Sequence, residues 1–306
     1  MISSRSADGL APISGAKAEI GNSADKTAGS PSLPREPQVV LEPRSSWPSL
    51  NVAELWAHRE LLYFLIWRDL KVRYKQTALG VAWVVLQPLL MTLIFTIVLG
   101  RLVRVPTSNI PYPLFAYAGI MLWTFFGAAV SLTSNCLVGN AALITKVYFP
   151  RLIIPIASIV ARLVDLFVAF AILILIMFYY GFGVSFQFLF VIVPLLLLSL
   201  FALAFGLWTS AVNVKYRDVG LALPVIIQLW MFVSPVIYPA AIVPERWRMA
   251  YSLNPLVGIL ESFRASLFAT AQPWNAVAFS TVITLVLLIY AVISFQRREK
   301  SFADLV

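Results

Sequence analysis

The chain has 306 residues, of which 60% are hydrophobic and only 12% are charged. A soluble globular domain carries about 25% charged residues and roughly 45–50% apolar ones, so this composition excludes an ordinary soluble protein and indicates several membrane spans. The net charge is +9, and the basic residues lie mostly beside apolar segments. This placement favours a membrane-topology signal over nucleic-acid binding. We therefore expect an all-α integral membrane protein that binds no nucleic acid.

Residues that could carry catalysis or bind a metal are scarce. Cys136 is the only cysteine and His58 the only histidine, so neither an internal disulfide nor a Cys/His metal cluster can form. The sequence contains no Gly-rich phosphate-binding loop, and no carboxylates are paired where a polar cleft is expected. We predict no metal site, no cofactor and no enzymatic activity in this chain, and we expect any energy for transport to come from another subunit.

The N-terminal part divides into a polar tail and a basic helix. Residues 1–46 are rich in Ser, Ala, Gly and Pro, and such a segment buries too little apolar surface to order itself, so we expect a disordered cytoplasmic tail. Residues 51–75 have helical composition. Arg68, Lys71 and Lys75 are spaced by three and four positions, so they share one helical face. Aromatic side chains along this segment are typical of a membrane interface. We predict a helix lying in the cytoplasmic membrane surface.

Six apolar segments follow, and each is long enough to cross a membrane as a helix. They cover about residues 81–100, 114–137, 158–180, 188–212, 219–238 and 276–295. Lys and Arg are concentrated before the first segment, between the second and third, between the fourth and fifth, and after the sixth. The positive-inside rule then places both termini in the cytoplasm. We expect one transmembrane domain over residues 47–300 and a cytoplasmic C-terminus at 301–306.

The third segment contains two charged residues, Arg162 and Asp165. A spacing of three lets them pair on one helix face. Two readings stay open: an ion pair satisfied near the cytoplasmic interface, or a pair that contacts substrate or transmits motion.

The loop before the last segment is predicted to lie outside the cell, yet residues 239–273 are strongly apolar. Within it, residues 255–268 are too short to span a membrane, and the chain is expected to break at Asn254–Pro255. We predict a re-entrant hairpin that dips back from the outer face, where protein must cover its backbone. The alternative is a short amphipathic helix on the outer leaflet.

Beyond these patterns, the chain resembles the permease subunit of ABC-2 type polysaccharide exporters, which export lipid-linked O-antigen, capsule or teichoic-acid chains. The stretches that carry the resemblance are RDLKVRYKQTALGVAWVVLQPLL, YPLFAYAGIMLWTFF, LVGNAALITKVYFPRLIIP, NVKYRDVGLALPVIIQLWMFVSPVIYP and LNPLVGILESFR. It covers about residues 48–300, in order. It implies a homodimer bound to two ABC ATPase subunits, which would hold ATP and Mg, and a continuous channel for a polymer between the two permeases.

The resemblance also implies functional positions. The basic helix corresponds to the family's interfacial helix, where the diphosphate of a polyprenyl-linked substrate would meet Arg68, Lys71, Arg73 and Lys75; anchoring to anionic membrane lipids is the alternative. The short cytoplasmic loops would contact the ATPase through Lys146, Arg151, Arg217 and Asp218, unless these are simply solvated. The outer hairpin would be gated or oriented by Asn254, Glu261 and Arg264.

Aromatic residues expected at the outer ends of the spans are candidates for stacking on sugar rings. They are Tyr112, Tyr117, Trp123, Phe125 and Phe126. The alternative is an ordinary aromatic belt at the membrane interface.

We therefore predict the permease subunit of an ATP-driven ABC transporter that exports a polyprenyl-diphosphate-linked polysaccharide across the cytoplasmic, or inner, membrane. One alternative is an ABC-2 permease for a small drug or a lipid. A second is a membrane-embedded glycosyltransferase, which would need catalytic carboxylates in a polar cleft.

Overall fold

The computed structural model describes residues 52–75, 82–107 and 110–305. The chain divides into two units, Met1–Ser46 and Trp47–Val306, and all described residues belong to the second. The predicted tail, residues 1–46, lies outside the described residues. Throughout the described ranges the regular structure is helical, with no β-strand, which confirms the all-α prediction.

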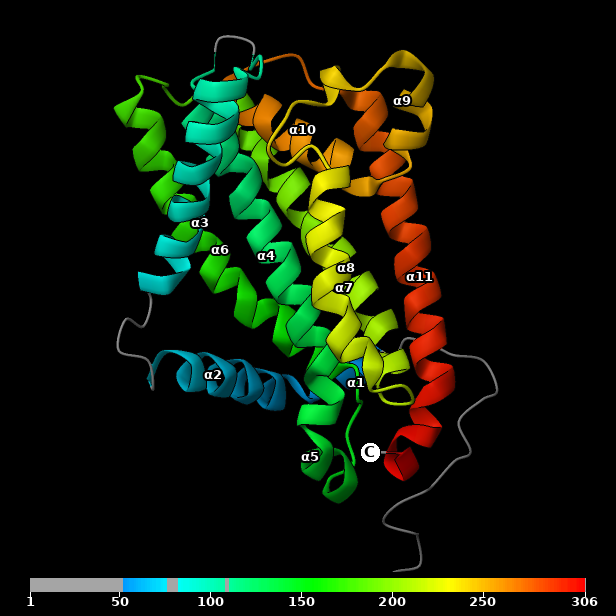
Figure 1. The fold of residues 1–306 in the computed structure, drawn as a ribbon. Coiled ribbons are helices and arrows are strands. Elements are labelled where there is room, and N and C mark those ends of the chain that lie inside the picture. Colours follow the sequence, from blue (N-terminus) through cyan, green and yellow to red (C-terminus); the bar gives the residue numbers. More distant parts are fainter. Residues whose placement is uncertain (1–51, 76–81, 108–109, 306) are drawn as a thin grey trace, which may run out of the picture. The chain divides into compact units, whose positions relative to one another are not determined.

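The first two helices form the segment that was predicted as one basic helix. They are α1 (Val52–Ala57) and α2 (Arg59–Lys75), with a turn at His58, where the backbone N–H donates to the Glu54 carbonyl at 3.3 Å. In Figure 1, α2 runs across the long helices near one end of the bundle. It packs against α6, and Leu65 is its one fully buried side chain among those described.

Five long helices are apolar enough to cross a membrane. They occupy Ala82–Val103, Tyr112–Gly139, Ile153–Tyr179, Phe186–Asn213 and Trp274–Glu299. These ranges comprise α3 (Ala82–Phe95) with the π-helix η1 (Thr96–Val103), α4 (Tyr112–Gly139), α6 (Ile153–Tyr179), the 3-10 helix η2 (Phe186–Val191) with α7 (Ile192–Asn213), and most of α11 (Trp274–Leu305). They overlap five of the six predicted segments.

The remaining predicted segment, residues 219–238, corresponds to a shorter helix. This is α8 (Asp218–Val233), with 16 residues, or about 24 Å, whereas the hydrocarbon core is about 30 Å thick. The helix stops early because Ser234 takes an extended backbone conformation. The chain then forms a turn that side chains of α10 hold in place.

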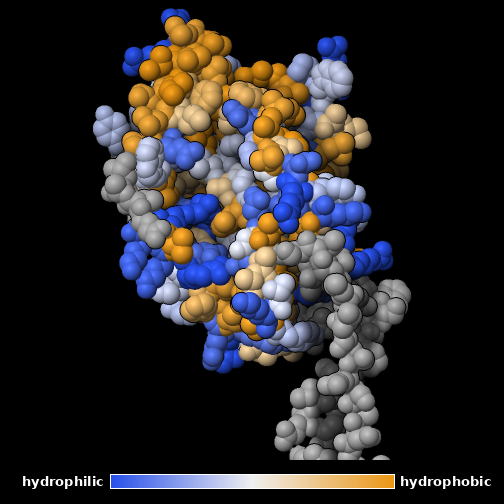
Figure 2. All heavy atoms as spheres, turned by 60° about the horizontal axis from the view of Figure 1, so that its bottom comes forward, coloured by the Kyte–Doolittle hydropathy of each residue, from blue (hydrophilic) through white to orange (hydrophobic). Residues whose placement is uncertain are grey.

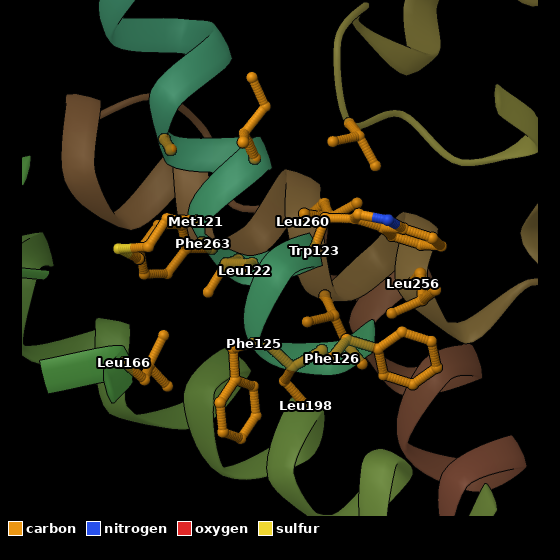
Figure 3. Close-up of a cluster of buried hydrophobic side chains, with 14 of the residues drawn as sticks. Met121, Leu122, Trp123, Phe125, Phe126, Leu166, Leu198, Leu256, Leu260 and Phe263 are labelled. Atoms are coloured by element: carbon orange, nitrogen blue, oxygen red, sulfur yellow. The ribbon is translucent and has the colours of Figure 1, made fainter. Parts of the chain in front are cut away.

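Helix α4 lies at the centre of the bundle between α6 and α7. Within its apolar window 78% of the residues are buried, compared with 11% for the window that contains α3. Phe126 of α4 stacks on Phe201 of α7 at a ring-centroid distance of 5.3 Å. Close approach of these helices also depends on Gly206, where a Cβ atom would lie 2.7 Å from Thr133. Figure 3 shows this core around α4.

The end of the bundle opposite α2 carries three short elements, η3 (Ala240–Ile242), α9 (Glu245–Ser252) and α10 (Pro255–Phe268). Every residue of α10 except Glu261 is buried. Its neighbours are α11, η2, α7, α4 and α9. The α2 end carries the short helix α5 (Ala141–Lys146), the turn between α7 and α8, and the end of α11.

Candidate functional site

A pocket of about 260 Å³ lies at the junction of α2, α3, α4 and α6. Its polar lining comprises four hydrogen-bonded side chains, Arg73, Tyr74, Arg162 and Asp165, together with Gln87 and Thr124. The apolar wall includes Trp83, Pro88, Phe125 and Leu166. The pocket therefore brings together residues from three groups that the sequence analysis treated separately: a basic residue of the interfacial helix, a candidate sugar-stacking ring and the charged pair of α6.

Asp165 is the centre of the polar wall. Its Oδ2 accepts a hydrogen bond from Arg162 Nη1 at 3.1 Å, so the pair predicted from their spacing is present. The same oxygen accepts from Arg73 Nη1, and Oδ1 accepts from the Tyr74 hydroxyl. The contacts from α2 could not be read from the sequence, because Arg73 and Asp165 are 92 positions apart.

Among the described residues that line the pocket, two carry a positive charge and one carries a negative charge. Arg73 and Arg162 share the single carboxylate of Asp165, and the side chain of Asp165 is only 13% exposed. A charge this buried is stable only when it is paired and hydrogen-bonded. Burial also raises the pKa of Tyr74 to about 12, so its hydroxyl stays protonated at physiological pH and remains a donor.

The other basic residues of α2 lie apart from the pocket lining. Arg68 pairs with its neighbour Asp69 at 2.8 Å, and Lys71 and Lys75 are exposed. Figure 2, which turns the α2 end toward the viewer, shows hydrophilic side chains gathered at this end among hydrophobic patches. Of the four predicted phosphate-facing residues, Arg73 alone lines this pocket.

The predicted ATPase contacts lie at the end of α5, just before α6 and at the start of α8, and Figure 1 shows these parts of the helices at the α2 end. Lys146, Arg217 and Asp218 are exposed. Arg151 is half-buried, and its backbone N–H donates to Glu299 Oε1 of α11 at 3.2 Å while its guanidinium donates to the Glu299 carbonyl. Three of the four are thus accessible, and Arg151 joins the start of α6 to the end of α11. Contact with an ATPase remains a prediction for all four.

A buried amide at the same end was missed by the sequence analysis. Asn213, at the end of α7, is 2% exposed. Its Nδ2 donates to the Ser134 carbonyl and to Asn135 Oδ1, both at 3.1 Å, and its Oδ1 accepts from the Gly220 N–H at 2.9 Å. It therefore joins α4, α7 and α8. The one signal in the sequence was an amide at the end of a long apolar segment.

At the opposite end, the three predicted gate residues form one group, which we call the α10 clamp (Asn254, Glu261 and Arg264). Asn254 caps α10 by accepting from the Leu256 N–H at 3.2 Å, and its Nδ2 donates to Ser234 Oγ at 2.9 Å. Glu261 Oε1 accepts from the Ala240 N–H at 3.2 Å. The clamp thus holds the segment 234–240 that follows α8.

Arg264 is the most enclosed member of the α10 clamp, with 4% of its surface exposed. It donates to the carbonyls of Pro235 and Val236 at 2.7 and 2.6 Å, and its guanidinium lies 3.7 Å from the centre of the Phe115 ring. Gly119 makes room for it, because a Cβ atom there would lie 2.4 Å from Arg264 and 2.1 Å from the Val236 carbonyl oxygen. The contacts describe a fixed joint, and a gating role remains a prediction.

The five candidate sugar-facing rings are all buried in α4. The hydroxyl of Tyr112 donates to the Ile237 carbonyl at 2.8 Å and that of Tyr117 to the Ala169 carbonyl at 3.2 Å. Trp123, Phe125 and Phe126 lie in the core that Figure 3 shows. Contact with sugars remains a prediction for these rings, and it would require the surrounding helices to part. Phe125 alone among the five lines the pocket.

Comparisons with known proteins agree on one class. A family model described as ABC-2 type transporter matches residues 60–268. The O-antigen export system permease protein RfbA of Myxococcus xanthus is 29% identical over 260 residues, which cover 83% of this chain and 98% of that protein. The protein of the same name from Klebsiella pneumoniae is 25% identical over 252 residues, with 80% and 95% covered. The polysialic acid transport protein KpsM of Escherichia coli is 24% identical over 243 residues, with 78% and 93% covered.

Proposed function

Because the chain belongs to the ABC-2 type transporter family, we propose that it is the permease subunit of an ATP-driven exporter of a polyprenyl-diphosphate-linked polysaccharide, O-antigen or capsule-like, in the cytoplasmic membrane. One observation carries this proposal: permeases and transport proteins named for O-antigen and polysialic acid match 78–83% of the chain. The match covers nearly the whole length of those proteins, so it concerns the transport unit and not a shared fragment.

We infer six membrane crossings, with α8 as the fifth. Supporting this, α8 runs from the α2 end toward the α10 end, and α7 and α11 run the opposite way. Its side chains Leu221, Val225 and Leu229 are exposed at 79%, 59% and 62%, as lipid or a partner helix would require. Basic residues concentrate at the α2 end, which supports a cytoplasmic location for that end. Residues 47–300 then form one transmembrane domain, and both termini lie in the cytoplasm.

Helices α1 and α2 would lie in the cytoplasmic membrane surface. The support is the pattern of exposure: Trp56, Tyr63 and Trp67 are 70%, 69% and 54% exposed, and Lys71 and Lys75 are exposed on the same segment. Large aromatic and basic side chains together are typical of a membrane–water interface. Arg68, Lys71 and Lys75 would there meet phosphate groups of membrane lipids, and Arg73, which lines the pocket, would be the one of the four that meets the phosphate of the substrate.

Helix α10 would be part of a re-entrant hairpin at the outer face. Its 14 residues span about 21 Å, too short to cross the membrane. Burial on nearly every side argues against a helix lying flat on the outer leaflet. The close fit to α11 depends on Gly258, where a Cβ atom would lie 2.3 Å from the Ala276 carbonyl oxygen. The α10 clamp would set the position of this hairpin near the channel exit.

The functional assembly would contain two copies of this chain and two ABC ATPase subunits. ATP and Mg would bind the ATPases, and the polymer would pass between the two permeases. The exposed side chains of Lys146, Arg217 and Asp218 at the α2 end are available for contact with the ATPases.

Among the described residues, no group of three or more His, Cys, Asp or Glu could hold a metal ion, and the pocket contains only one carboxylate.

The test is deletion of the gene, complemented with the full chain. We expect the deletion strain to accumulate lipid-linked glycan in the cytoplasm and to lose it from the cell surface, and complementation to restore it. We also expect an ABC ATPase to co-purify with the chain. Normal surface glycan in the deletion strain would overturn the proposal, and would turn attention to a small drug or a lipid as the substrate.

A further inference from the structure

Three hydrogen-bond donors on two helices converge on one carboxylate at the edge of the pocket. Arg73 and Tyr74 come from α2, Arg162 comes from α6, and all three donate to Asp165. The three donor side chains and the carboxylate all line the pocket. A pocket large enough for a small ligand therefore lies next to three donors, and these donors already bind the carboxylate of Asp165.

The donors suit a phosphate better than a carboxylate. Guanidinium groups bind phosphate through charge-assisted and often bidentate hydrogen bonds, and the Tyr74 hydroxyl adds a neutral donor. The guanidinium groups of Arg73 and Arg162 both pair with the same carboxylate oxygen, Asp165 Oδ2. Arg162 Nε is buried and makes no hydrogen bond, so its donor capacity is only partly used. A diphosphate offers more oxygen atoms and more negative charge than Asp165 can supply.

The apolar part of the pocket suits an apolar chain attached to that phosphate. Trp83, Pro88, Phe125 and Leu166 form its apolar wall. On α3, Leu86 follows Trp83 by three positions and Leu90 follows Leu86 by four, so these residues share a helical face. All three are exposed, at 52%, 37% and 45%. An isoprenoid or acyl chain leaving the pocket would therefore meet an apolar helix surface.

We propose that this pocket binds the phosphate or diphosphate head group of a membrane lipid, and that Asp165 is a built-in competitor that occupies the donors while the pocket is empty. Entry of the phosphate moves the hydrogen bonds of Arg73, Arg162 and Tyr74 from Asp165 to the ligand. The inference rests on the proposed function, and it places the phosphate on α2 and α6 together instead of on the exposed lysines of α2.

The test is equilibrium binding of farnesyl diphosphate to the purified full-length chain in nanodiscs of phosphatidylcholine. We expect Asp165→Asn to bind about tenfold more tightly than the unaltered chain, since the amide competes less well than a carboxylate for the two guanidiniums. We expect Arg162→Gln to bind at least tenfold more weakly. A weaker or unchanged affinity in Asp165→Asn would overturn the competitor role, because a purely structural carboxylate would not hinder binding.

Two further variants test whether the change in affinity arises in the pocket. Asp69→Asn removes the same charge from α2, where Asp69 pairs with Arg68 outside the pocket, and we expect less than a twofold change. An equal gain in both Asp→Asn variants would indicate a general charge effect and contradict the proposal. If Asp165→Asn fails to fold, Tyr74→Phe decides instead: it retains both ion pairs, and an unchanged affinity would count against the site.

Additional measurements distinguish a prenyl diphosphate from other lipid phosphates as the ligand. They also distinguish failure of the pocket from failure of the proposed export function. Farnesol should not bind measurably. Nanodiscs containing phosphatidylglycerol should compete only weakly if the ligand is a prenyl diphosphate, and strongly if the pocket takes any lipid phosphate. Failure of all phosphate ligands, while the deletion strain still accumulates glycan, would overturn the pocket and leave the export function standing. Normal export in the deletion strain would overturn the function itself.

Discussion

The two ends of the transmembrane unit each contain a cluster organised by arginine, and the clusters differ in what the arginine contacts. In the α10 clamp, Arg264 is buried and donates to two backbone carbonyls, those of Pro235 and Val236. In the pocket near α2, Arg73 and Arg162 donate to a side chain, Asp165, beside open space. The two backbone carbonyls can move away from Arg264 only if the turn that contains them unfolds. The carboxylate of Asp165 is on a side chain, so its hydrogen bonds can be exchanged without a change in the backbone. The first cluster is built as a joint, and the second is the cluster that we propose as a binding site.

Among the substitutions that test this difference between the clusters, we expect Arg264→Leu to lower the free energy of unfolding most. Replacing the arginine with leucine leaves the Pro235 and Val236 carbonyls without their donor, and Glu261 without a cation 3.5 Å away. We expect a loss of about 3–5 kcal/mol in the free energy of unfolding, measured by denaturant titration of the purified chain. Arg264→Lys should recover only part of it, because lysine lacks the planar fork that reaches both carbonyls. A loss under about 1 kcal/mol would show that the joint is not rigid.

A second, smaller effect is expected where α4 makes room for the same joint. Gly119→Ala places a Cβ atom 2.1 Å from the Val236 carbonyl oxygen, and we expect it to lower stability by about 1–3 kcal/mol through overpacking. Gly139→Ala on the same helix is the matched control, since nothing lies within 4 Å of its Cβ position. That change should be neutral or slightly stabilising. Equal destabilisation by both would refute the tight fit at Gly119.

The pocket near α2 should tolerate substitution better than the clamp. Arg162 is 21% exposed, and Asp165 would still have Arg73 and Tyr74 as partners after Arg162→Gln. We expect a loss of about 1–2 kcal/mol in the free energy of unfolding, together with a strong loss of glycan export. The ratio of lost export to lost free energy of unfolding can be compared between Arg162→Gln and Gly119→Ala. If the two variants show the same ratio, the pocket would have only a structural role.

The smallest effect is expected on the surface of α2. Arg68 pairs with Asp69 and its side chain is 36% exposed, so Arg68→Gln should change the free energy of unfolding by less than about 1 kcal/mol. Surface glycan should remain near the level of the unaltered chain, measured by antibody binding to intact cells. Loss of export in this variant would instead favour a phosphate site spread over the whole basic face of α2.

Local patterns in the sequence predicted where the helices lie. Contacts between segments far apart in the sequence determine where some helices end and which side chains come together. The apolar stretch 255–268 is α10 residue for residue, because Asn254 caps it and Pro255 fits its first position. The Arg162–Asp165 pair follows from helical spacing alone. The early end of α8 at Val233 could not be foreseen, since it depends on side chains of α10.

The candidate site shows the same limit. The sequence indicated Arg73 as one of four basic residues on a surface helix, and Phe125 as one of five rings. That these two line one pocket with Asp165 depends on how α2, α4 and α6 pack together. Such packing is encoded in many weak contacts between segments and not in a short motif, so periodicity and spacing cannot reveal it.

The most direct test of the central claim is transport in proteoliposomes that contain the chain and its co-purified ATPase, with lipid-linked polysaccharide added to one side. The account predicts that the polymer moves into the vesicle lumen only when ATP, Mg and the ATPase are all present. It also predicts that Arg162→Gln abolishes movement without preventing assembly of the complex. Movement of the polymer by the chain alone, or of free short lipids but never of the polymer, would contradict it.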